Sequence, residues 1–184
     1  GDREAVIQSA EALGVTEFLV PAIDSASFDA TLDIASKYEN VYCALGIHPH
    51  SASEWNAEVG QKIITEAANN PKVRAVGEIG LDYFYDFAPR DVQVHAFREQ
   101  IELAKTLGKP IIIHTRDSID ETLDILEDCY KSVEKSYLFG QLHCFSGTVE
   151  QMRRAVEAGF CVSYTGNITF KNSTLSDCVR ETPI

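Results

Sequence analysis

Four of the five histidines in this 184-residue sequence lie at or near the ends of short apolar segments, as do two carboxylates and one arginine. These side chains are His48, His50, Glu78, Asp82, His114, Arg116 and His143. A lone histidine in such a place is readily explained as a core residue with both ring nitrogens hydrogen-bonded. Several imidazoles together with carboxylates are instead typical of zinc, manganese or iron sites. The group therefore indicates a metal-dependent site.

Glu78, His114 and His143 are the candidate metal ligands, although they lie far apart along the chain. Each belongs to a different apolar segment. If those segments are parallel strands of one barrel, their ends meet at one mouth and the three side chains converge. A carboxylate such as Glu78 can also bridge two ions.

The stretch "GIHPH" places His48 and His50 in a His-x-His spacing, which can direct both rings to one face of a strand. Pro49 argues against that geometry, because proline removes a strand hydrogen-bond donor and restricts the residue before it. We therefore expect both histidines on the loop after the strand. There they would contact substrate or support the ligands rather than bind the metal.

Arg116 stands two residues after His114, so the two side chains would share one face of a strand. Its planar guanidinium suits a phosphate or carboxylate oxygen, although a surface ion pair is the simpler alternative. Asp82 either orients a neighbouring histidine or caps the following helix, and both alternatives stay open. We predict His48, Asp82 and Arg116 as catalytic residues, and His48, His50 and Arg116 as substrate contacts.

Alternating apolar and amphipathic segments must position these side chains. The apolar segments span residues 17–23, 41–47, 73–81, 109–114, 137–145 and 160–166. The amphipathic segments span residues 27–39, 54–69, 89–108, 118–133 and 148–159. In the longest of these, Pro89 suits the first turn and Gly108 the end of a helix. The uniformly apolar strands predict an α/β fold with parallel pairing and helices packed outside.

Two α/β architectures fit this alternation, an open doubly wound sheet and a closed (β/α)8 TIM barrel. The first often carries a glycine-rich phosphate loop, and the sequence contains no G-x-G-x-x-G segment and no P-loop. The second spreads polar residues over the carboxyl ends of many strands, which is the distribution seen here. We therefore predict the barrel.

The composition limits the partners and the cellular compartment that we expect for the protein. The formal net charge of −12 argues against broad electrostatic adhesion to nucleic acid, so any positive field must be local. The five cysteines are scattered, never in a Cys-x-x-Cys spacing, which predicts reduced thiols. No apolar run is long enough to span a bilayer, and the first residues do not resemble a signal peptide. We expect a cytoplasmic protein with no membrane partner.

Four stretches, "GIHPH", "GEIGLDY", "IIIHTRD" and "LHCFSG", occur in this order with helices between them. In these four stretches and their order the chain resembles the TatD-type metal-dependent hydrolases, a branch of the amidohydrolase-like barrels. The resemblance implies a deoxyribonuclease dependent on Mg²⁺, Mn²⁺ or Zn²⁺, in some members a 3′-exonuclease on DNA or RNA. It further implies that Glu78 is shared by two ions, that His114 and His143 bind one of them, and that His48 and Arg116 lie near the substrate phosphate.

Two stretches typical of that family are not found, an opening Asp-x-His-x-His segment and a closing Thr-Asp-x-Pro-Tyr segment. We therefore expect residues 1–184 to form one partial barrel domain that lacks strands one and eight and keeps one incomplete metal site. Its two open sheet edges would favour association between copies.

The function predicted for the full-length parent is hydrolysis of phosphodiester bonds in DNA, with RNA as the alternative, by two-metal activation of water. A metal-dependent amide or ester hydrolase of the same superfamily is a second hypothesis. A third is that the chain is a non-catalytic remnant that acts only by binding. A Schiff-base aldolase is disfavoured, because Lys109 lies at the amino end of its strand.

Overall fold

The computed structural model describes residues 2–85, 87–134 and 138–183. The helices are α1 (Arg3–Ala12), α2 (Phe28–Lys37), α3 (Ala57–Asn69), α4 (Arg90–Leu107), α5 (Ile119–Tyr130), α6 (Val149–Glu157) and α7 (Ser176–Glu181). The strands are β1 (Phe18–Pro21), β2 (Val41–Leu45), β3 (Val73–Asp82), β4 (Ile111–Arg116), β5 (Gly140–Leu142) and β6 (Phe160–Val162). Short 3₁₀ helices cover Ser25–Ser27, Pro49–Glu54 and Gly166–Thr169.

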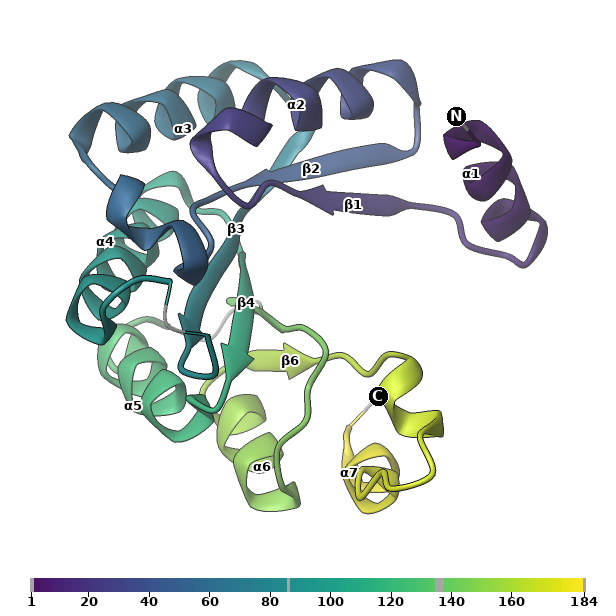
Figure 1. The fold of residues 1–184 in the computed structure, drawn as a ribbon, viewed down its shortest axis with the longest axis vertical. Coiled ribbons are helices and arrows are strands. Elements are labelled where there is room, and N and C mark those ends of the chain that lie inside the picture. Colours follow the sequence, from purple (N-terminus) through teal and green to yellow (C-terminus); the bar gives the residue numbers. More distant parts are fainter. Residues whose placement is uncertain (1, 86, 135–137, 184) are drawn as a thin grey trace.

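The six strands form one parallel sheet in the order β1-β2-β3-β4-β5-β6. The sheet curves into an arc, and helices α2 to α6 lie along its convex side (Figure 1). This is the α/β architecture of a partial TIM barrel, because the described strands do not close into a ring. The six predicted strands and five predicted helices are confirmed, except that Tyr137, which begins the fifth predicted strand, lies outside the described residues. Helices α1 and α7 were not among the predicted elements.

Local sequence signals account for the helix ends. Asn56 accepts hydrogen bonds from the backbone N–H groups of Glu58 and Val59 at the start of α3. Thr148 and Gln151 form a reciprocal capping box at the start of α6. Gly108 ends α4 with a φ of 60°, in the left-handed region that glycine adopts at little cost.

The core lies between the sheet and its outer helices. Strand residues Ile111 and Ile113 and the helix residues Phe97 and Ile101 are fully buried there. A strand buried on both faces needs apolar side chains throughout, which explains the uniformly apolar segments in the sequence. All five cysteines are free thiols, as predicted.

β1 and β6 do not pair with each other in the described part of the chain, so each has one open edge. The expected association of copies through these edges stays a prediction. No helix among the described residues combines the length and the apolar character that crossing a membrane requires.

Candidate functional site

The predicted site residues gather at the carboxyl edge of the sheet. Glu78 and Asp82 lie in β3, His114 lies in β4, and His143 directly follows β5. Parallel strands bring these ends to the same edge, here called the rim. β3 and β4 approach closely at Gly80, which pairs with His114. A Cβ atom at Gly80 would lie 2.1 Å from the His114 carbonyl oxygen, and the φ of +139° also favours glycine.

Glu78 is the centre of the rim. Its Oε1 atom lies 3.0 Å from His114 Nδ1 and 2.6 Å from His143 Nε2. The same oxygen is 3.7 Å from His48 Nε2. The backbone N–H of Glu78 donates to the carbonyl oxygen of Ala22, which ties the segment after β1 to the rim. The convergence of Glu78, His114 and His143 predicted from the sequence is therefore present.

Asp82 contacts two histidines and one turn. Its Oδ2 atom lies 2.8 Å from His50 Nε2 and 3.0 Å from His114 Nε2. Its Oδ1 atom accepts hydrogen bonds from the backbone N–H groups of Phe84 and Tyr85. Helix α4 begins without a side-chain cap from Asp82, since Pro89 occupies its N-cap position. Of the two alternatives for Asp82, contact with a neighbouring histidine is the one observed.

His48 and His50 lie on the loop after β2, as Pro49 predicts, with His48 at the N-cap of the Pro49–Glu54 3₁₀ helix. The backbone N–H of His50 donates to His48 Nδ1 at 3.1 Å. The rings meet edge to face with centroids 4.4 Å apart, and their Nε2 atoms address different carboxylates. His48 therefore joins the Glu78 group, whereas His50 joins Asp82.

Arg116 occupies a different position from the imidazoles. Its backbone pairs with Asp82 in the sheet, and its side chain is exposed. The guanidinium carbon lies 3.9 Å from the ring centroid of Phe84 and 4.8 Å from that of Tyr85. Arg116 is thus at the rim, stacked on aromatic rings that follow β3.

Burial and hydrogen bonds within the rim shift the pKa values of Glu78, Asp82 and His48. Burial by itself would raise the pKa of Glu78, but hydrogen bonds from His114 and His143 outweigh it and hold that pKa well below its ordinary value. The pKa of Asp82 is also lowered, because hydrogen bonds from the Tyr85 backbone and from His50 and His114 outweigh burial. Burial, together with the neighbouring His114, lowers the pKa of His48 to about 4. Near neutral pH the rim therefore combines two carboxylates with at least one neutral imidazole.

Two buried glutamines of α4 hold the rim loops, and the sequence reasoning missed both. The Gln93 side chain bonds the backbone N–H and carbonyl oxygen of Asp82 and also the carbonyl oxygen of Ala88. The Gln100 side chain bonds both backbone groups of Ile47, the residue before His48. Their seven-residue spacing places them on the inward face of α4. Polar side chains on an otherwise apolar helix face were the signal that could have found them.

The donor set of the rim fits a divalent metal ion. One ligand atom each from His48, Glu78 and His114 lies within 4.8 Å of the others. His143 reaches the same Glu78 oxygen. Imidazole nitrogen with carboxylate oxygen is a donor set for zinc, manganese or iron. His114 adds a second favourable feature, because the Asp82 carboxylate behind its other nitrogen is the partner that metal-binding histidines commonly have.

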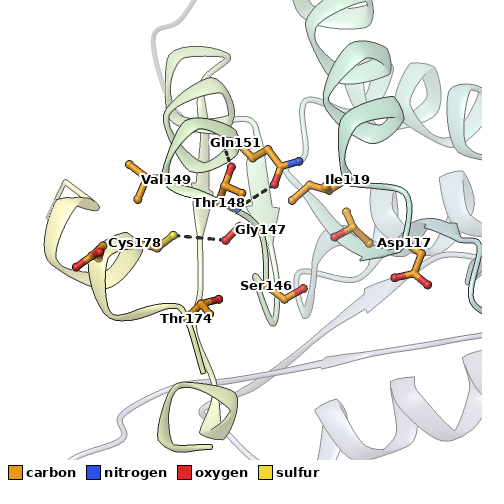
Figure 2. Close-up of a pocket in the computed structure, with 11 residues that line it drawn as sticks. Asp117, Ile119, Ser146, Gly147, Thr148, Val149, Gln151, Thr174 and Cys178 are labelled. Carbon is orange, nitrogen blue, oxygen red and sulfur yellow. Dashed lines mark hydrogen bonds between the residues drawn. The ribbon is translucent and has the colours of Figure 1, made fainter. Parts of the chain in front are cut away.

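A separate cleft of about 400 Å³ lies between the start of α5, the β5–α6 loop and α7 (Figure 2). Cys178 of α7 donates to the carbonyl oxygen of Gly147 across it. Asp117, Asp177 and several hydroxyl groups line the cleft. Thr115 reaches it from the face of β4 opposite to His114. Among the described residues, the seven predicted site residues do not line this cleft, so it is distinct from the rim.

Comparisons with known proteins identify one family. The family model described as TatD related DNase matches residues 1–184. The chain is 36% identical over 183 residues to the uncharacterised metal-dependent hydrolase YabD of Bacillus subtilis, covering 99% of this chain and 70% of that relative. It is 33% identical over 165 residues to the 3′-5′ ssDNA/RNA exonuclease TatD of Citrobacter rodentium, covering 90% of this chain but only 61% of that relative. The crystal structure of YJJV, a TatD homologue from Escherichia coli K12, matches with a TM-score of 0.89 and 32% identity, covering 100% of this chain and 70% of that one.

Proposed function

The chain belongs to the TatD-related DNase family, and from this membership we propose that its rim serves the metal-dependent hydrolysis of phosphodiester bonds in nucleic acid. The observation that carries the proposal is the meeting of Glu78 with an imidazole from β4 and one from the residue after β5, at 3.0 Å for His114 and 2.6 Å for His143. Relatives named as ssDNA/RNA exonucleases support a single-stranded substrate.

Glu78, His114 and His143 are the proposed ligands of one divalent ion, with Glu78 as the carboxylate that a second ion would share. His48 lies within reach of the same oxygen, so the geometry favours a metal role for it as well as the predicted contact with the substrate phosphate. Two-ion hydrolysis requires donors in addition to these four. A bound divalent ion would supply Lewis acidity and lower the pKa of a water molecule.

The remaining rim residues position the proposed ligands and offset the negative charge of the substrate. Asp82 accepts from His114 Nε2, which fixes the ring with Nδ1 directed at Glu78. The same carboxylate holds His50 beside the centre. The Arg116 guanidinium, exposed at the end of β4, would donate to a phosphate oxygen and offset its charge. This local positive charge matters because the chain as a whole carries a formal net charge of −12.

The test is degradation of end-labelled single-stranded DNA by the full-length protein that contains residues 1–184, with Mn²⁺, Mg²⁺ or EDTA present. We expect metal-stimulated shortening that Glu78→Gln abolishes, because the substitution keeps the shape of the side chain and removes its charge. Glu99→Gln, an exposed carboxylate on α4, is the matched control and should leave the rate unchanged. Comparing 5′- and 3′-labelled strands gives the direction of degradation. Metal-independent shortening, or shortening that persists in Glu78→Gln, would reject the proposal.

A further inference from the structure

Three large aromatic side chains follow β3 and remain exposed at the rim. Phe84 is 55% exposed, Tyr85 is 40% exposed and Phe87 is 66% exposed. Scattered exposed apolar residues are ordinary, but a contiguous cluster marks a surface that binds something. These three residues and Arg116 are called the aromatic platform below.

The platform is continuous with the candidate metal centre. The Tyr85 and Phe87 rings stack with centroids 5.5 Å apart and an interplanar angle of 28°. The His50 ring contacts both of them, with centroid distances of 5.3 Å to Tyr85 and 4.8 Å to Phe87. His50 in turn bonds Asp82, which bonds His114. A ligand lying on the platform therefore lies next to the rim.

The platform is also held in place by the rim itself. One Asp82 oxygen faces His50 and His114, while the other accepts from the backbone N–H groups of Phe84 and Tyr85. The preceding residue, Tyr83, donates its hydroxyl to Glu121 on α5. The Asp82 carboxylate thus orders both the platform and the two histidines. Preorganised aromatic rings lose little freedom when a flat ligand binds.

The chemistry of the platform selects a ligand with flat π-faces and negative charge. Aromatic rings stack on any nucleobase, and the Arg116 guanidinium adds a cation that suits both bases and phosphates. Only a single strand offers unstacked bases for such contact, since a duplex keeps its bases inside the helix. A protein partner would use the apolar rings but would not require a cation stacked on them.

We propose that Phe84, Tyr85, Phe87 and Arg116 form a base-stacking platform that seats single-stranded nucleic acid beside the metal centre. The proposal rests on the proposed phosphodiesterase function of the rim. It adds that recognition depends on the presence of bases and little on their sequence, because every base has a π-face.

The experiment measures binding in EDTA, so that no turnover is needed. Fluorescence anisotropy compares a dT oligonucleotide of about ten nucleotides with an abasic strand of equal length and charge. We expect the protein to prefer the dT strand by about five- to 100-fold. Phe87→Ala and Arg116→Lys should each lose most of this preference; the lysine keeps the charge but cannot stack as arginine does. Thermal unfolding of each variant confirms that it is folded.

Leu138→Ala is the matched control. Leu138 is 58% exposed and precedes β5, so it lies at the amino ends of the strands, opposite to the rim. Removing its side chain deletes a comparable apolar surface far from the rim and should leave the preference for bases unchanged.

Equal affinity for the dT and abasic strands would overturn the proposal. So would Phe87→Ala and Arg116→Lys variants that keep the preference of the unmodified protein for the dT strand. Sedimentation adds a further outcome. If Phe87→Ala abolishes self-association while DNA affinity stays the same, the patch is a contact between copies and the proposal fails. Base-dependent binding without any metal-stimulated hydrolysis would reject the proposed function alone. Hydrolysis without base-dependent binding would reject the platform alone.

Discussion

Glu78 Oε1 lies 2.6 Å from His143 Nε2, although the two residues are 65 positions apart in the sequence. β4 lies between their strands in the sheet and contributes His114, which contacts the same oxygen. β3, β4 and the residue directly after β5 thus each direct one polar side chain to a single point. A parallel sheet produces this arrangement because each helical connection returns the chain to the same edge.

Replacing His114 should remove metal binding, whereas replacing the one helical histidine should not. His114→Asn deletes a donor at the centre of the rim, and we expect the metal content after dialysis against Mn²⁺ or Zn²⁺ to fall by at least about tenfold. His95→Asn is the control, since His95 is exposed on α4. Mass spectrometry of the dialysed proteins gives the metal content. Equal metal in both variants would show that His114 is not a ligand.

Asp82→Asn should weaken metal binding without removing a proposed ligand. The amide has only one acceptor oxygen, so it cannot accept from His50 and His114 on one side and from the backbone N–H groups of Phe84 and Tyr85 on the other. The orientation of His114 is therefore less fixed. Loss of such a supporting carboxylate typically lowers metal affinity by about 10- to 100-fold. Isothermal titration with Zn²⁺ measures the change. An unchanged dissociation constant would mean that Asp82 serves the turn at Phe84 and Tyr85 and nothing more.

Gln100→Leu should destabilise the fold, because it leaves the buried N–H and carbonyl groups of Ile47 without partners. The expected loss in the free energy of unfolding is about 2–4 kcal/mol. Gln61→Leu, at an exposed position on α3, should change it by less than about 0.5 kcal/mol. Urea denaturation of both variants provides the comparison. Similar midpoints would show that Gln100 does not hold the His48 loop.

Cys43 should resist alkylation while the protein is folded. Burial, reinforced by the nearby Glu66, raises the pKa of its thiol to about 11, and only the thiolate reacts. At about pH 8, iodoacetamide should therefore modify exposed Cys144 well before Cys43. The folded state keeps the Cys43 proton that the unfolded state loses above about pH 9, so this thiol also lowers stability as the pH rises further.

Peptide mass spectrometry resolves the two cysteines over time. Labelling of Cys43 at the same rate in the native protein and in urea would contradict its burial. Cys144 labelled in urea serves as the reference for full reactivity.

Much of the fold follows from the sequence alone. The strand and helix segments could be predicted because uniformly apolar strands and capped amphipathic helices are local patterns. The convergence of Glu78, His114 and His143 followed from the parallel topology that those patterns predict. Pro49 correctly placed His48 and His50 on a loop, because proline acts on its own backbone and on the residue before it.

Other features depend on contacts between segments that are distant in sequence. The sequence left the contacts of Asp82 open between a neighbouring histidine and a helix cap, and only the packing brings its carboxylate to the His50 and His114 rings. Arg116 stacks on Phe84 and Tyr85 because the end of β4 lies beside the turn after β3. The side chains of Gln93 and Gln100 form hydrogen bonds with backbone groups that only the packing of α4 brings near them.

The sequence by itself determined the class of fold, the parallel strands and the residue types of the candidate metal centre. Those properties depend on local periodicity and on the chemistry of each side chain. Only the tertiary structure decided which nitrogen faces which carboxylate, which amides support the rim and which aromatic rings lie beside it. The physical reason is that hydrogen bonds and ring contacts act over a few ångströms, and the register of packed elements sets such distances.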